Sequence, residues 1–540
     1  MNDSGRQTSP QHDQEDDFHL NNDKHLPDSD VINTTAATLT WTLFKAVCFS
    51  SLGGILFGYD MGVISGALPQ IAAAFDLTES QQESVVSFLY LGGGFGAATG
   101  GYVCDFSGRK TAIILTDLIF VAGALILYTS QSYATVLCGR FVVGFAVAVS
   151  GCADVSYLSE ISPTNWRGSI VSRNEACITF GFLLAYLAGY GFTAMDPYNG
   201  WRTMFGISAI GALAQLIGML NMPESPIWLA GRKRALEAKV SLMRLHDFAS
   251  SDEVDRYYNT KFHNIMTSEQ LGFNTLHGYK DAAKYNSTDP AGETYGSAEA
   301  AMDVRQLFRQ SIITLFLSVV QQFCGHSNVL NFAPIIFAKA GIGQGSALAS
   351  TILLGTVKFL VTIFVIWKID TIGRRVLLLS GMSLIGVSLL CMSVAFLNEE
   401  YIIEQLAILG AVGMATGYAA SFGPLTWLIT SEIFPYNIRG RALGASAILN
   451  CISASLVSYT FLSVSSHFGA AVPFMVYLII TLTAIVFASI SIPDTGFKSP
   501  TEIHADIQAM WFWRVCNRCF ARTRVKTDEE VVARLKTSLV

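Results

Sequence analysis

The chain has 540 residues, of which 51% are hydrophobic and only 14% are charged, and its net charge is −6. Soluble domains usually carry about 25% charged residues, so this composition argues against a soluble protein and favours one that lies in a bilayer. Because no basic cluster is interleaved with aromatic residues, nucleic-acid binding is not expected. The ten cysteines mostly lie singly inside apolar runs, which excludes a secreted disulfide framework.

Residues 1–42 form a polar tail rich in Asp, His, Ser and Asn, which predicts disorder. No basic segment precedes a short apolar core there, so we expect no cleavable signal peptide. Twelve apolar runs of about membrane-spanning length follow. They cover residues 43–66, 82–104, 111–130, 134–157, 169–190, 202–222, 310–337, 346–368, 375–397, 403–430, 441–464 and 472–492. We therefore predict an all-α membrane protein with twelve transmembrane helices.

Two short motifs each occur twice, in the same order. Residues 105–110 (DFSGRK) recur as residues 370–375 (DTIGRR), and residues 160–168 (EISPTNWRG) recur as residues 432–440 (EIFPYNIRG). A shared offset of about 270 residues indicates two related halves. We place a six-helix half at 43–222, a central insert at 223–309, a second six-helix half at 310–492 and a tail at 493–540. Transporters with this organisation bind their substrate between the halves.

Basic residues predict the orientation in the membrane. They gather in the links between runs 2 and 3, 4 and 5, 8 and 9, and 10 and 11, whereas Lys339 is the only basic residue in the opposite set of loops. Both termini and the insert should therefore be cytoplasmic. Residues 232–245 of the insert have helical periodicity with alternating charge, which predicts a short amphipathic helix under the bundle.

The C-terminal tail carries two weak signals. Cys516 and Cys519 form a lone CxxC, for which metal binding and palmitoylation are equal guesses and an unmodified tail is the simpler interpretation. The last residues, Ser538, Leu539 and Val540, match the pattern that PDZ domains read, although chance also explains so short a match.

Glycines recur every four residues in the first two spans. Gly54, Gly58, Gly62 and Gly66 form one stripe, and a second stripe runs through residues 92, 96 and 100. Such stripes let membrane helices approach closely. Packing is the preferred interpretation, and a gating role stays open because glycine-rich helices bend readily.

Two isolated charges lie inside apolar runs, Asp60 in the first and Arg140 in the fourth. Charges at such positions are costly and need partners. The two residues form either a permanent structural salt bridge or a proton-coupling pair, in which the carboxylate gains and loses a proton as the pair separates. The sequence alone supports both alternatives about equally.

Polar side chains also interrupt the C-terminal spans. Gln321, Gly325 and Asn328 are spaced for one helical face, and Gln322 adds a third carboxamide. Amides donate and accept hydrogen bonds, which suits a ligand made of hydroxyl groups, although they also join helices to one another. We expect a ligand-binding face here.

Further candidates lie in four other spans. Trp427 follows a Gly-Pro break, and its indole can either cover an apolar sugar face or belong to the interfacial belt. Asn450 and Glu175 are further polar candidates for substrate binding. Lys358 is a third intramembrane charge, for which Glu175 is a possible partner.

The duplicated motifs supply charge pairs at helix ends. Charge-assisted bonds between Asp105 and Arg109, and between Glu160 and Arg167, can latch one state of a transporter or serve as static ties. The matching residues of the second half are Asp370, Arg374, Glu432 and Arg439. We expect a cytoplasmic gating network from these eight residues.

No HExxH, GxSxG or phosphate-binding glycine-rich motif is present, so we expect no enzyme activity, no cofactor and no metal site. The motifs together resemble the sugar porter family of the major facilitator superfamily over residues 43–500. Residues 223–226 (PESP) resemble its signature after helix 6, with Ile227 where Arg is usual. Residues 493–495 (PDT) resemble the signature after helix 12, and residues 321–325 (QQFCG) resemble the helix 7 sugar-binding motif.

Ser327 departs from this motif, since many members of the family have Asn at its position. With Asn328, Asn174, Glu175 and Lys358, the pattern is closer to the class III facilitative sugar transporters. The resemblance implies sugar contacts for Gln321, Gln322, Trp427 and Asn450, and it places Glu175 where many glucose carriers have Gln. It also implies that Asp60 and Arg140 match the proton-coupling pair of proton-linked sugar symporters.

We therefore predict a carrier for a hexose or related polyol that works by alternating access with proton symport. We expect it in the plasma membrane, with endomembranes as the alternative. A passive uniporter is the first alternative function. A membrane sugar sensor is the second, and it is disfavoured because only a short tail follows the last span. The expected partners are the sugar or polyol, the proton, the lipid bilayer and a PDZ-domain protein at the C-terminus.

Overall fold

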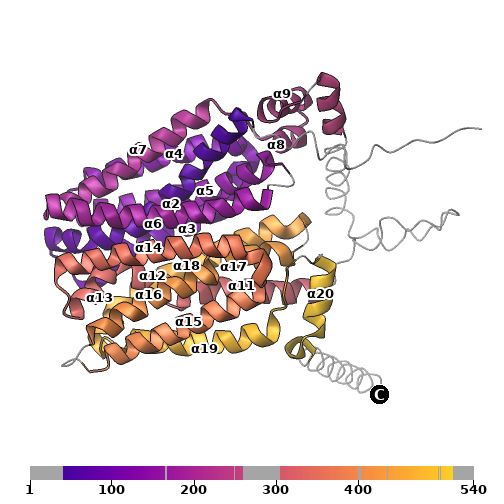
Figure 1. Cartoon of the computed structure of the whole chain (residues 1–540). Coiled ribbons are helices and arrows are strands. Elements are labelled where there is room, and N and C mark those ends of the chain that lie inside the picture. The colour runs from indigo at the N-terminus through magenta and orange to yellow at the C-terminus, as the bar shows by residue number, and fades with distance from the viewer. Residues whose placement is uncertain are drawn as a thin grey trace, which may run out of the picture.

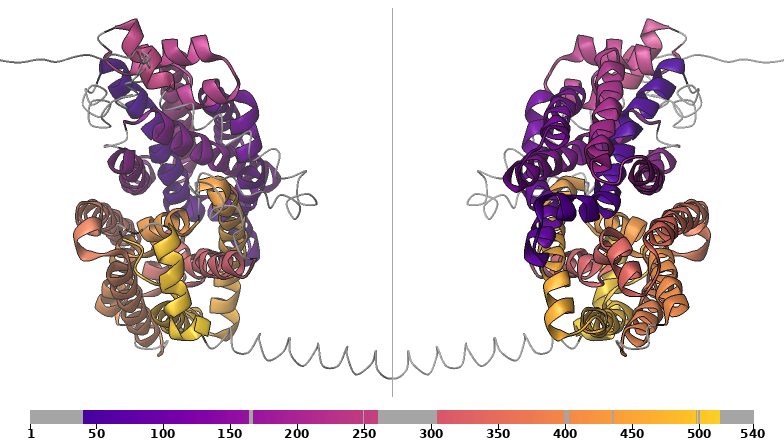
Figure 2. Two further views of the ribbon diagram at one scale, coloured as in Figure 1. Left: turned by 90° about the vertical axis from the view of Figure 1, so that its right-hand side faces the viewer. Right: turned by 90° about the vertical axis from the view of Figure 1, so that its left-hand side faces the viewer.

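A computed structural model describes residues 40–163, 167–248, 250–259, 304–398, 403–434, 436–496, 498 and 500–514. The expected tail features at residues 516–519 and 538–540 lie outside these ranges. Every regular element within them is a helix, and the helices form two bundles (Figures 1 and 2). The N-terminal bundle contains α2 (Trp41–Phe75), α3 (Glu79–Ser107), α4 (Arg109–Tyr128), α5 (Tyr133–Ile161), α6 (Arg167–Met195) and α7 (Gly200–Leu220).

The C-terminal bundle repeats this arrangement with two of its spans broken. It contains α11 (Val304–Phe323), α12 (His326–Asn331), α13 (Ala333–Lys339), α14 (Gln344–Ile372), α15 (Arg374–Ala395), α16 (Glu404–Ala420), α17 (Phe422–Ile433), α18 (Tyr436–Phe468) and α19 (Val472–Ser491). The first break is at Gly325, whose φ of 79° lies in the left-handed region that glycine adopts without strain. A short second break separates α16 from α17.

Eleven described stretches are long and apolar enough to cross a membrane. The twelfth expected span, α3, is not among them, but it has 29 residues and packs along α5 and α18. The twelve-helix expectation is confirmed, and the fold is an all-α membrane architecture.

The glycine stripes let helices touch backbone to backbone. A Cβ on Gly58 would collide with the carbonyl of Ile178 in α6, and one on Gly92 would collide with the carbonyl of Phe141 in α5. These contacts join α2 to α6 and α3 to α5. They support the packing interpretation of both stripes.

Short helices lie at one end of the two bundles, which we call the insert side, and the opposite end is the far side (Figure 1). The insert side carries α8 (Pro226–Gly231), α9 (Ala235–Leu245) and α20 (Pro500–Ala509). The hydroxyl of Tyr157 donates to the carbonyl of Pro223 (2.7 Å), and Thr40 Oγ1 donates to the carbonyl of Leu245 (2.6 Å). These bonds fasten the start of the insert beneath the N-terminal bundle. The helix predicted for residues 232–245 is confirmed as α9.

Candidate functional site

Three amide side chains meet in the C-terminal bundle. Gln322 Nε2 donates to Asn450 Oδ1 (3.0 Å), and Asn450 Nδ2 donates to Gln321 Oε1 (2.9 Å) and to the carbonyl of Ser318 (3.0 Å). Gln321 Nε2 donates to the hydroxyl of Tyr418 (2.9 Å). We call Gln321, Gln322 and Asn450 the amide cluster. Its members hold one another in fixed orientations, which is what a site for several hydroxyl groups requires.

The expectation that Asn328 shares a face with Gln321 is wrong. α11 ends at Phe323 and α12 starts at His326, so the 3.6-residue period does not carry across the break. Asn328 is fully buried, and its Nδ2 donates to the hydroxyl of Tyr477 and to the carbonyl of Val457, both at 2.8 Å. Ser327, and not Asn328, contacts the amide cluster, because Ser327 Oγ donates to Gln322 Oε1 (2.7 Å).

Aromatic and charged groups border the amide cluster. The rings of His326 and Tyr418 stack with centroids 3.4 Å apart and an interplanar angle of 4°. Lys358 of α14 places Nζ 3.8 Å from the ring centroid of Phe182 and 5.4 Å from that of Tyr418. A cation over aromatic rings is stabilised by their quadrupoles. Lys358 is thereby held at the boundary between the bundles.

Glu175 reaches the same boundary from α6. A Cβ on Gly423 would lie 3.4 Å from Glu175 Oε1, so the carboxylate abuts the start of α17. Glu175 is half-buried and close enough to Lys358 for the charges to interact, but no ion pair within 4 Å joins them among the described side chains. Trp427 is half-buried on α17, one turn beyond Gly423.

Asp60 and Arg140 lie next to each other but are not joined as a salt bridge. Arg140 Nη1 donates to the backbone carbonyl of Asp60 (3.2 Å), and its Nε donates to the carbonyl of Val85 (3.3 Å). Both carboxylate oxygens of Asp60 are buried without a hydrogen-bond partner, and so is Arg140 Nη2. An ionised carboxylate in such surroundings is expensive, so the neutral form of Asp60 suits this state.

The duplicated motifs build the same triad twice on the insert side. In the first half, Arg109 Nε donates to Glu160 Oε1 (2.9 Å), and Ser225 Oγ donates to Glu160 Oε2. In the second, Arg374 Nη2 lies 3.5 Å from Glu432 Oε1, and the Thr495 hydroxyl donates to Glu432 Oε2 (2.5 Å).

The other motif residues occupy the edges of these triads. Asp105 Oδ1 also pairs with Arg109 Nη1 (3.2 Å), and the Arg439 guanidinium donates to the carbonyl of Phe434 (3.5 Å). The side chains of Arg167 and Asp370 lie outside those described. The bonds described for each triad lie within one bundle.

The bundles do meet on the far side. The Glu83 carboxylate accepts hydrogen bonds from Ser463 N (2.8 Å) and Ser463 Oγ (2.6 Å), which links α3 to α18. Deeper in, Asn331 Nδ2 donates to the hydroxyl of Tyr90 (3.0 Å). These bonds close the far side.

The same two helices separate towards the insert side. Cys451 of α18 still touches α3, because its Sγ lies 3.4 Å from the Cβ position of Gly93. The antiparallel register of α3 and α18 would next bring Gly101 opposite Gly444, yet nothing lies within 4 Å of the Cβ position of either glycine. The contacts between α3 and α18 are therefore closer towards the far side, and Gly101 and Gly444 leave space towards the insert side.

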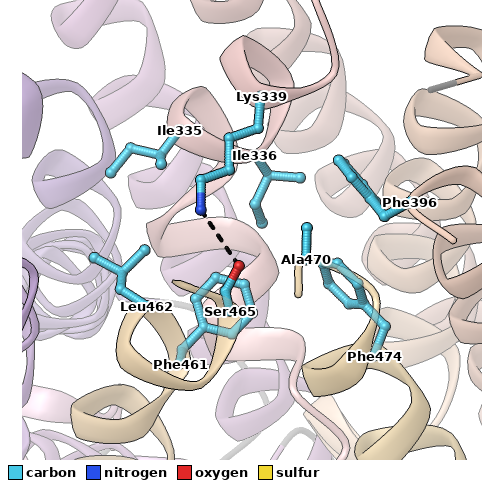
Figure 3. A pocket seen from close by; sticks show the side chains of 9 residues that line it. All are labelled: Ile335, Ile336, Lys339, Phe396, Phe461, Leu462, Ser465, Ala470 and Phe474. Atoms are coloured by element: carbon cyan, nitrogen blue, oxygen red, sulfur yellow. Dashed lines mark hydrogen bonds between the residues drawn. The ribbon is translucent and has the colours of Figure 1, made fainter. Parts of the chain in front are cut away.

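A small pocket in the C-terminal bundle lies apart from this site (Figure 3). Its lining is almost entirely apolar, and Lys339 Nζ donates to Ser465 Oγ across it (3.3 Å). Ligand sites need several convergent polar groups. This pocket offers one hydroxyl and one ammonium that already satisfy each other, so it does not suit a sugar.

Comparisons with known proteins agree with this architecture. The family model described as sugar (and other) transporter matches residues 46–507. The chain belongs to this family. It is a multi-pass membrane transporter and not an enzyme, as expected from the sequence.

Similar proteins include sugar carriers from animals and bacteria. The facilitated glucose transporter member 10 of solute carrier family 2 from Danio rerio is 30% identical over 515 residues, which cover 86% of this chain and 92% of the relative. The galactose-proton symporter of Escherichia coli is 31% identical over 471 residues, which cover 85% and 94%. Among solved structures, the major facilitator proton:xylose symporter XylE bound to 6-bromo-6-deoxy-D-glucose is 25% identical, with 86% of this chain and 98% of that chain covered and a TM-score of 0.67.

Sequence reasoning missed several residues of the site. His326 and Asn331 are polar groups inside an apolar run, so the rule that singled out Gln321 could also have found them. Tyr418 gave no such signal, because tyrosines are common in membrane spans. Its role becomes visible only when α16 and α17 bring it against Gln321 and His326.

Proposed function

We propose that the protein carries a hexose or related polyol across its membrane by alternating access, coupled to symport of a proton. The observation that supports the sugar assignment most strongly is the amide cluster, which presents several fixed donors and acceptors at the boundary between the bundles. The names of the relatives, which include glucose, galactose and xylose carriers, agree with a substrate of this class.

Each site residue has a distinct role in this proposal. Gln321, Gln322 and Asn450 bind hydroxyl groups, and Trp427 covers the apolar face of the ring. Glu175 faces the substrate from the opposite bundle. Asn328 lies apart from the amide cluster, and its amide nitrogen joins α12 to α18 and α19 by donating to Val457 and Tyr477.

The proton is assigned to Asp60. In the state described here Asp60 lacks a charged partner, which favours its protonated form. When Arg140 turns from the backbone carbonyl of Asp60 to its carboxylate, the ionised form becomes favourable and the proton leaves. A passive uniporter would use the same sugar site without this exchange.

The experiment is uptake of labelled hexoses and polyols by purified protein in liposomes, with and without a pH gradient. We expect one or a few of these compounds to enter, and acid outside to drive uptake above equilibrium. Entry that ignores the gradient would support a uniporter, and binding without entry would support a sensor.

We further propose that the insert side faces the cytoplasm, as the distribution of basic residues predicts, and that the protein resides in the plasma membrane. The PDZ partner is tested by deleting residues 538–540: unchanged localisation and unchanged pull-downs from the native cell would remove it.

A further inference from the structure

A second polar cluster lies inside the N-terminal bundle, away from Asp60. Asp154 of α5 is 1% exposed and accepts three hydrogen bonds from neutral side chains. Ser150 Oγ donates to Oδ2 (2.7 Å), while Ser50 Oγ of α2 and Gln215 Nε2 of α7 donate to Oδ1 at 3.2 and 3.1 Å. The absence of a side chain at Gly53 makes room for the carboxylate, since a Cβ there would collide with Oδ2.

A second buried carboxylate lies on α4, which packs along α5. Asp117 is 2% exposed, and its Oδ2 has no hydrogen-bond partner. The carboxylates of Asp117 and Asp154 are close enough to repel each other if both are ionised.

Two further observations describe the surroundings of these carboxylates. Gln215 is fully buried, and its Oε1 has no hydrogen-bond partner although its Nε2 reaches Asp154. No lysine, arginine or histidine lies within 4 Å of Asp117 or Asp154 among the described residues.

Several charged groups on the neighbouring helices are engaged elsewhere, and the thiol of Cys104 is a further titratable group beside Asp154. Three basic side chains donate to backbone carbonyls: Lys110 to that of Leu220, Arg202 to that of Ser130, and Arg140 to carbonyls of α2 and α3. Arg109 pairs with Asp105 and Glu160, and Lys45 lies over the ring of Trp41. Glu83 accepts from Ser463, and Glu175 interacts with Lys358.

We propose that Asp117 and Asp154 form a second proton-binding site, in which the two carboxylates hold one proton taken up from the solvent. Two adjacent buried carboxylates without a cation cannot both stay ionised, and a shared proton removes the repulsion. The three neutral donors then stabilise the charge that remains on Asp154. Sodium is the competing occupant, because the cluster consists mainly of oxygen atoms.

This site is separate from Asp60. Ser50, which touches Asp154, and Asp60 both lie on α2, about 15 Å apart along the helix axis. The proposal therefore does not rest on sugar transport, and it can fail or succeed whatever Asp60 does.

Infrared spectroscopy of the full-length protein in the Asp60→Asn background tests the proposal. A protonated carboxyl group absorbs at a different infrared frequency from an ionised carboxylate, and the frequency of its band shifts in D2O. At neutral pH we expect such a band, its loss in the Asp117→Asn/Asp154→Asn variant and a changed band in either single variant. Because each single variant alters the pair, the test stands even if the double variant does not fold.

Two results would overturn the proposal. The first is an identical protonated-carboxyl region in the parent and in both single variants, which would mean that both carboxylates are ionised. The second is a melting temperature that rises with added NaCl but not with added choline chloride. If this rise is seen only while Asp117 and Asp154 are intact, the occupant of the site is sodium.

Discussion

Replacement of Gln321 by alanine tests the amide cluster directly. The side chain of Gln321 makes three hydrogen bonds, to Tyr418, to the carbonyl of Phe422 and from Asn450. The substitution removes one partner of the sugar and also frees Tyr418 and Asn450 to move. A buried polar group left without its partner costs about 1–3 kcal/mol. We therefore expect the dissociation constant for the sugar to rise at least about fivefold, which corresponds to about 1 kcal/mol.

Gln310 provides a matched control on the same helix. It is fully buried, and its Nε2 donates to the carbonyl of Ile433 (3.0 Å), three turns away from the amide cluster. Gln310→Ala removes the same atoms and should lower stability to a similar degree while leaving sugar affinity unchanged.

The assay is equilibrium binding of the labelled sugar that proves to be transported, measured on purified wild type and both variants. Melting curves confirm that each variant is folded. If Gln321→Ala binds as tightly as wild type, the cluster only joins helices. If Gln310→Ala weakens binding equally, the effect comes from α11 as a whole and the reasoning is refuted.

Three further predictions concern the contacts between the bundles. Glu83→Gln weakens the bonds to Ser463, so a cysteine probe placed on the far side should become more accessible to labelling; unchanged labelling would contradict this. Lys358→Met leaves Glu175 without its opposite charge and should lower the melting temperature, which Glu175→Gln in the same protein should restore; additive losses would speak against the pairing. Gly444→Phe fills the space that α3 must enter on closure, so it should stop transport but preserve sugar binding, and normal transport would be contrary to expectation.

Much of this architecture could be predicted from the sequence, because each relevant signal is local. Apolar runs mark the spans, and the duplicated motifs mark the halves. The motif residues can be found in this way, but not all of their partners: the sequence predicts a bond between Glu160 and Arg167, whereas Glu160 contacts Arg109 and Ser225.

The arrangement of the site could not be predicted fully, because it depends on breaks and on contacts between distant segments. The break at Gly325 turns Asn328 away from Gln321 and brings Ser327 to the amide cluster. Periodicity cannot show this, because it assumes a continuous helix. The sequence also could not show that Arg140 donates to the backbone carbonyl of Asp60 and not to its carboxylate.

The most direct test of proton coupling compares accumulation with exchange in one preparation of Asp60→Asn. The substitution keeps the backbone carbonyl that accepts from Arg140 and breaks no side-chain hydrogen bond, so the protein should fold normally. One pH unit is worth about 1.4 kcal/mol, which allows about tenfold accumulation by wild type at one proton per sugar. We predict that Asp60→Asn loses this accumulation while sugar exchange at equal concentrations continues. Accumulation that persists in Asp60→Asn, or a loss of about 3–5 kcal/mol in stability as for a permanent buried ion pair, would contradict the assignment.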